Sequence, residues 1–195
     1  MPDPPHDLSG GSLTIKVTIR DIRPPVWRRL TVPASMGLLA FHDALQKAFG
    51  WTDSHLHVFV QGRRRFEVFH PGHEMSRGPD ELTDERTVML GELLRAKGDA
   101  LDYQYDMGDF WEHAVVVEEV SEAADEKCRC LAGARSGPPE DCGGTSRYGE
   151  ILEALADPDH PEHDELSEWL GDGFDPEAFD LAAINRSLAR PRRRK

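Results

Sequence analysis

Alternating hydrophobic and polar residues mark the first two thirds of the chain as a sheet. Residues 13–19 alternate strictly, as a half-buried strand does. Residues 26–32 resume the pattern after a break at Pro24 and Pro25. The two segments are therefore predicted to pair as a hairpin. Four more strands are predicted, of which the last two form a second hairpin: residues 56–60, 64–68, 101–105 and 111–120.

Hydrophobic residues at helical spacing predict one long helix within the sheet region and three helices after it. Residues 37–49 have this spacing, and Gly50 is a natural C-terminal stop. A shorter helix is predicted at residues 91–95. The later patterns cover residues 148–155, 166–170 and 179–188, with Asp175 and Pro176 as a start signal for the last. Residues 70–86 and 123–146 are polar or rich in Gly and Pro, which is typical of loops.

This order of elements predicts an α+β fold. We expect a mixed β-sheet with a β-grasp-like hairpin-helix-strand core, and C-terminal helices packed on it. The predicted single domain covers residues 12–188, between a disordered N-terminus (1–11) and a basic tail (189–195). Within it we distinguish a sheet part (12–122), a junction rich in Cys, Gly and Pro (123–146) and a helical part (147–188).

The charge of the chain argues against binding nucleic acid across its surface. The net charge is −13, and the tail is basic, so the body is more acidic still and repels a phosphate backbone. Contact with nucleic acid is predicted only through Arg190, Arg192, Arg193, Arg194 and Lys195; the alternative is a frayed, solubilising end. No apolar run reaches the roughly 18 residues of a membrane span, and the first residues do not resemble a signal peptide. We therefore expect a cytoplasmic protein with no membrane partner.

Two segments form a candidate cleft. His55 and His57 are two residues apart on a predicted strand, so both side chains should face one ligand or metal. The second segment combines carboxylates, an imidazole and aromatic rings, which suits acid–base chemistry or a hard cation. The alternative is that a tight turn requires Asp and Gly, and that the aromatic rings belong to the core. The candidate residues are Trp51, Asp53, His55, His57, Tyr105, Asp106, Asp109, Trp111, Glu112 and His113.

Cysteines and histidines in the junction and the helical part suggest a second site, for zinc. Thiolates and imidazoles are the ligands that zinc prefers, although the spacing is not that of a standard Cys-x-x-Cys pair. The alternative is an acidic helix start with solvated histidines. The candidate ligands are Cys128, Cys130, Cys142, His160 and His163. The chain has no nucleophile elbow, phosphate-binding loop or dinucleotide fingerprint. The sequence therefore gives no support to a classical hydrolase, an NTPase or a dinucleotide-binding enzyme.

Five ordered motifs resemble the plasmid pRiA-type ORF-3-like family: residues 22–29, 49–57, 105–113, 130–133 with 138–144, and 155–160. The similarity runs from about residue 13 to about residue 188. The resemblance implies a compact α+β domain, found mostly in bacteria and archaea and often near plasmid or mobile-element genes. One departure concerns a cysteine that usually precedes Pro-Pro-Glu-Asp-Cys in the family, where this chain has Gly137. Cys128 is a nearby thiol that would substitute for it.

Three functions remain open at this point. The first is a binding or interaction module of unknown ligand, with a structural metal at Cys130, Cys142 and a nearby histidine. The second is a metal-dependent or acid–base enzyme that uses the histidines and aspartates of the candidate cleft. The third is a nucleic-acid accessory protein that acts through its basic tail.

Overall fold

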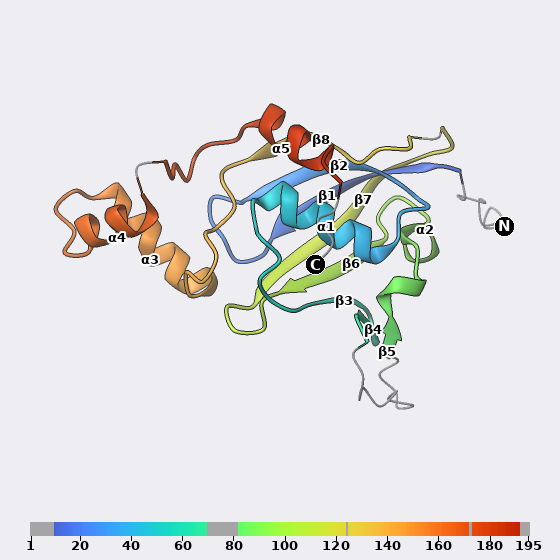
Figure 1. Ribbon diagram of the computed structural model, residues 1–195, viewed down its shortest axis with the longest axis horizontal. Coiled ribbons are helices and arrows are strands. Elements are labelled where there is room, and N and C mark those ends of the chain that lie inside the picture. Colours follow the sequence, from blue (N-terminus) through green and yellow to red (C-terminus); the bar gives the residue numbers. More distant parts are fainter. Residues whose placement is uncertain (1–9, 70–81, 124, 172, 192–195) are drawn as a thin grey trace.

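An eight-stranded mixed sheet runs through the computed structural model of the protein, which describes residues 10–69, 82–123, 125–171 and 173–191 (Figure 1). The strand order is β5-β4-β3-β6-β7-β1-β2-β8. Neighbouring strands are antiparallel, except for the parallel pair β4 and β5. The strands are β1 (Ser12–Ile19), β2 (Trp27–Pro33), β3 (His57–Gln61), β4 (Arg64–Glu67), β5 (Leu82–Asp84), β6 (Ala100–Tyr105), β7 (Trp111–Ser121) and β8 (Arg129–Ala134).

Five α-helices and one 3-10 turn complete the described part of the chain. They are α1 (Leu38–Phe49), η1 (Glu85–Thr87), α2 (Leu90–Leu93), α3 (Gly144–Ala156), α4 (His163–Leu170) and α5 (Leu181–Leu188). The α+β prediction is confirmed, as are both hairpins and the helix that ends at Gly50, whose φ of 86° lies in the left-handed region. Among the described residues, no helix is both long enough and apolar enough to cross a membrane.

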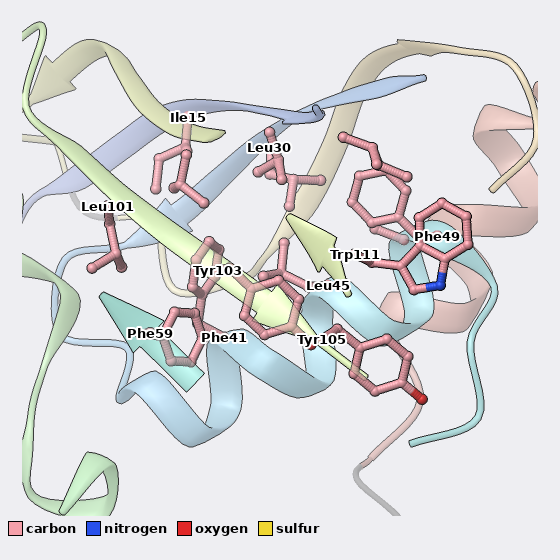
Figure 2. Close-up of a cluster of buried hydrophobic side chains, with 14 of the residues drawn as sticks. Ile15, Leu30, Phe41, Leu45, Phe49, Phe59, Leu101, Tyr103, Tyr105 and Trp111 are labelled. Atoms are coloured by element: carbon pink, nitrogen blue, oxygen red, sulfur yellow. The ribbon is translucent and has the colours of Figure 1, made fainter. Parts of the chain in front are cut away.

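The core lies between α1 and one face of the sheet. Alternate residues of β7, such as Trp111 and His113, are buried on this face, while Glu112 lies on the other face and accepts a hydrogen bond from Gln104. Figure 2 shows side chains of α1 gathered with those of the sheet: Phe41, Leu45, Phe49, Phe59, Tyr103, Tyr105 and Trp111. One covered and one polar face is the usual arrangement of an antiparallel sheet.

Helix α5 covers the end of the sheet at β8 and also contacts α1 (Figure 1). The side-chain amide of Asn185 on α5 binds the backbone of Cys130 on β8 at both of its polar groups. The Cys130 N–H donates to Asn185 Oδ1 (2.9 Å), and Asn185 Nδ2 donates to the Cys130 carbonyl (2.9 Å). This amide thereby occupies hydrogen-bonding groups that a further strand would otherwise use.

Several predicted boundaries were wrong. Strand β8 lies inside the predicted loop 123–146, and β5 lies inside the predicted loop 70–86, of which residues 70–81 are outside the described part. β5 has only three residues, and β8 contains Gly and Ala, so neither has a clear alternating pattern. Helix α5 begins after Asp180, whose side chain accepts a hydrogen bond from the Ala183 N–H. Residues 1–9 of the predicted disordered N-terminus and residues 192–195 of the basic tail are also outside the described part.

Candidate metal centre

Three segments that are distant in the sequence meet beside the end of β6. They are residues 51–56 before β3, the turn 106–110 between β6 and β7, and residues 138–144 before α3. Trp51 Nε1 donates to the Pro138 carbonyl (2.9 Å), and the Trp51 ring stacks on Tyr105. Asp109 Oδ2 accepts from the Gly143 N–H (2.9 Å). These contacts hold the three segments together without regular secondary structure.

The imidazole of His55 is surrounded by three carboxylates at this junction. Its Nε2 atom lies 3.1 Å from Asp141 Oδ1, 3.6 Å from Asp106 Oδ2 and 3.8 Å from Glu140 Oε2. Nε2 is buried and makes no hydrogen bond with any described residue. Asp141 Oδ1 is within hydrogen-bonding distance of Nε2, so it is the angle between the two groups that does not meet the geometry of a hydrogen bond. Asp141 Oδ1 therefore lies to the side of the axis along which Nε2 donates or accepts, and the other two oxygens lie beyond hydrogen-bonding distance.

The distances from His55 Nε2 to Asp141 and Asp106 fit a shared metal ion. Ligand atoms bound to zinc at about 2.0–2.2 Å are about 3.0–3.6 Å apart around a single ion. One ligand atom each from His55, Asp106 and Asp141 lies within 4.8 Å of the others, and Glu140 approaches the same imidazole nitrogen. In the described part of the chain, no other group of three His, Cys, Asp or Glu side chains meets this distance condition.

Outer hydrogen bonds orient two of the carboxylates. Tyr105 Oη donates to Glu140 (3.0 Å to Oε1), and the Thr52 N–H donates to the same oxygen (2.8 Å). Asp106 Oδ1 accepts from the Gly108 N–H (2.8 Å), which leaves Oδ2 facing His55. Burial and the adjacent charge of Glu140 raise the pKa of Tyr105, so the phenol remains a donor at neutral pH. Such partners are typical of the outer shell of a metal site.

The start of α3 fixes the position of the carboxylates that precede it. Gly144 has a φ of 74°, and a Cβ atom there would lie 2.5 Å from the Asp109 carbonyl oxygen. We expect Gly144→Ala to lower the free energy of unfolding by about 1–3 kcal/mol, because it combines a strained backbone with a clash. Gly149→Ala in the same helix is the matched control, since a Cβ at Gly149 meets nothing within 4 Å. It should stabilise the protein by up to about 1 kcal/mol through helix propensity. Equal effects of the two variants in urea unfolding would contradict this account.

His57 is separated from His55 by its contacts. Its ring stacks on His42 with centroids 3.5 Å apart, and its Nε2 lies 2.9 Å from Glu85 Oε2. Asp53 lies in the same buried network, 2.9 Å from His42 Nε2. The expectation that His55 and His57 share one ligand is not met, because β3 begins only at His57. His55 lies outside the strand, so the rule that side chains two residues apart face the same side does not apply to it.

Other residues of the predicted cleft have structural roles. His113 is fully buried under Phe49 and Trp51, and its Nδ1 donates to the carbonyls of Trp111 (3.1 Å) and Tyr103 (3.2 Å). Burial lowers the pKa of His113 to about 4. The prediction that His57, Asp106 and His113 line one cleft is therefore wrong. Trp111 is also buried, Glu112 faces the other side of the sheet, and Asp109 binds the Gly143 N–H.

The predicted cysteine–histidine ligands do not come together. Cys130 lies on β8, Cys142 precedes α3, and the two histidines lie beyond the far end of α3. His163 Nδ1 donates to the Ala154 carbonyl (2.9 Å), while His160 Nδ1 accepts from the Glu162 N–H (3.2 Å). Burial raises the pKa of both Cys128 and Cys142 to about 12, which disfavours the thiolate that a metal requires. The predicted zinc site is thus not formed by these five residues.

Sequence reasoning missed Glu140 and Asp141 as candidate ligands. The sequence did contain an indication of them, because the Pro-Pro-Glu-Asp-Cys motif has two adjacent carboxylates, which are possible metal ligands. Gly137 precedes them in the sequence. A Cβ at Gly137 would lie 2.0 Å from the Phe49 carbonyl oxygen, so this glycine lets the segment lie directly against the end of α1.

Known proteins are similar to this chain in sequence and in fold. The chain is 37% identical over 176 residues to "Uncharacterized protein y4hQ" of Sinorhizobium fredii, with 89% of each chain covered. The fold of the chain is similar to that of MM3350 from Methanosarcina mazei Go1, a protein of unknown function, as seen in its crystal structure. The TM-score is 0.76 at 34% identity, over 88% of this chain and 96% of that one. The family described as "Plasmid pRiA4b ORF-3-like protein" matches residues 12–183, which include all three segments of the site. The chain therefore belongs to the plasmid pRiA4b ORF-3-like family.

Proposed function

We propose that the protein is a metal-binding module that holds a divalent transition-metal ion between His55, Asp106, Glu140 and Asp141. The observation that carries the proposal is the set of three carboxylate oxygens within 3.8 Å of one imidazole nitrogen, which forms no hydrogen bond with any described residue. A divalent ion gives this nitrogen a partner and offsets two of the three negative charges at the same time.

Electrostatics supports an ion more strongly than a direct contact between the side chains. A protonated His55 would bring one positive charge to three negative ones, and its Nε2–H would satisfy one oxygen at most. Carboxylates held close together without enough positive charge repel each other. The outer hydrogen bonds from Tyr105, Thr52 and Gly108 orient the oxygens and leave that excess charge in place.

The ligand set favours particular ions. Imidazole suits zinc, iron and nickel, and carboxylates suit manganese and magnesium, so one histidine with three acids favours Mn²⁺, Fe²⁺ or Zn²⁺. Asp141 is 72% exposed, which places the site at the surface, where water or a substrate can approach. An ion with an open position acidifies bound water and polarises carbonyl or phosphoryl oxygens.

Isothermal titration calorimetry of untagged, EDTA-stripped protein with Mn²⁺ and Zn²⁺ tests the proposal. We expect one ion per chain. His55→Ala and Asp106→Asn should each weaken binding by more than about 100-fold, and Tyr105→Phe by about 10–100-fold, as outer partners of metal ligands do.

Matched controls come from an Asp–His pair outside the cluster. Asp159→Asn and His160→Ala remove the same residue types beyond α3, and both should leave the affinity unchanged. Failure of both ions to bind the unaltered protein would overturn the proposal. So would a loss of binding in the His160→Ala protein with normal binding in the His55→Ala protein.

A further inference from the structure

Arg28 carries a charge inside the protein, next to a cavity. Its side chain rises from β2 towards the end of α1 and is 2% exposed. Nε donates to the Ala48 carbonyl (2.8 Å), and Nη1 donates to the carbonyls of Trp27 (2.8 Å) and Ala134 (3.0 Å). The guanidinium also lies 5.0 Å from the ring centroid of Phe49 and 5.2 Å from that of Phe179. These contacts fix the orientation of the group.

No anion within the described part of the chain neutralises this guanidinium. No described carboxylate lies within ion-pair distance of it, and no described residue accepts a hydrogen bond from Nη2. The other buried arginine, Arg135, pairs with Glu177. The partial negative charge at the C-terminus of α1 offsets part of the Arg28 charge but is not a full counter-charge. Buried charges in proteins are usually paired, because removing them from water is costly.

The cavity beside Arg28 has the size and lining of a small-molecule site. Its volume is about 590 Å³, within the usual range of ligand pockets. Its walls come from the end of α1, from residues 136–140 and from the segment between α4 and α5. Phe174, Phe179, Ile184 and Trp169 supply apolar surface, and Trp169 is 51% exposed.

Two acidic residues also line the cavity, but both have other partners. Asp180 caps α5 through the Ala183 N–H, and its side chain is 65% exposed. Glu140 binds Tyr105 and Thr52. The Lys47 side chain pairs with Asp43 at a distance of 2.6 Å. Arg28 is therefore the charged group of this cavity that lacks a counter-charge among the described residues.

We propose that this cavity binds a small organic monocarboxylate with an aromatic or branched apolar body, whose carboxylate pairs with Arg28. The apolar body would lie against Trp169 and Phe179. The single uncompensated positive charge of Arg28 matches a ligand with one negative charge. A phosphate dianion would bring one more negative charge than Arg28 can offset into an already acidic protein. The planar fork of a guanidinium suits a carboxylate in particular. The proposal does not depend on the metal site.

Calorimetry with 2-naphthylacetate and its neutral analogue 2-naphthylacetamide tests this inference, in excess EDTA so that the metal site does not contribute. We expect the carboxylate to bind at one molecule per chain and the amide to bind at least about 30-fold more weakly, as for the loss of one partner of a buried charge pair. Arg28→Met should reduce the affinity for the carboxylate by a similar factor.

Surface variants keep the test valid if the Arg28 variant does not fold. Trp169→Ala should weaken binding of the carboxylate by about tenfold, and Ala183→Trp, which fills the cavity, should abolish it. Leu131→Ala is the control, because Leu131 is 47% exposed on β8 and does not line the cavity. Equal affinities for the carboxylate and the amide would overturn the proposal. So would no binding of either probe, or binding of an apolar peptide with a free C-terminus but not of the small carboxylate.

Discussion

Replacing Phe41 by alanine is expected to lower the free energy of unfolding by about 3–5 kcal/mol. Phe41 is fully buried on α1 and stacks on Phe59 of β3 at a centroid distance of 5.9 Å. Its ring fills the space between the helix and the middle of the sheet (Figure 2). Removing it leaves a cavity that the surrounding aromatic rings cannot close. Urea unfolding followed by circular dichroism measures the loss.

Phe110→Ala provides the control for this prediction. Phe110 is 48% exposed in the turn between β6 and β7, so the same substitution there should change the stability by no more than about 0.5 kcal/mol. A loss below about 1 kcal/mol for Phe41→Ala would show that the packing of α1 on the sheet contributes less than its burial indicates.

Acidification is expected to destabilise the protein through His113. Burial lowers the pKa of His113 to about 4, while the unfolded chain titrates at about 6.5. The unfolded state therefore binds the proton more tightly, and stability falls as the pH drops between these two values. The loss attributable to His113 is about 2 kcal/mol between pH 7 and pH 5, and about 3 kcal/mol in full. Burial lowers the pKa of His42 as well, which adds to the loss in the same direction.

The contribution of His113 is isolated by His113→Gln, which stays neutral and retains an N–H donor for the carbonyls of Trp111 and Tyr103. The two proteins should be compared by urea unfolding at pH 7 and at pH 5. The substituted protein should lose less stability than the original, by about 2 kcal/mol. The same loss in both proteins would mean that His113 is not the group responsible.

Much of the fold could be predicted because strands with one buried face have a clear signature. β1 and β6 alternate hydrophobic and polar residues, and α1 has an apolar face that ends at a glycine. β8 was not predicted as a strand, because two of its six residues are alanine and one is glycine, which leaves no clear alternating pattern. Its place in the sheet depends on pairing with β2 and on Asn185, which are contacts over long sequence distances.

The site was predicted only in part, for a related reason. His55 and Asp106 were identified because each lies in a segment dense in chemically active residues. The same density led to the inclusion of His57, Trp111 and His113, which the structure places in buried contacts. Local composition does not reveal which side of an irregular segment a residue faces. Glu140 and Asp141 reach His55 only because residues 138–144 fold back onto the turn after β6.

The contact between Asn185 and Cys130 also bears on how the molecules behave at high concentration. The last strand of an open sheet is a template on which another chain can add a strand, and this is a common route to aggregation. Here a single side-chain amide on α5 occupies both backbone polar groups of Cys130, the second residue of that strand. Protection of the sheet edge at β8 therefore depends on α5 remaining packed against it. Partial detachment of the helix would expose β8 while the rest of the sheet stayed folded, so self-association can begin well below the temperature of global unfolding.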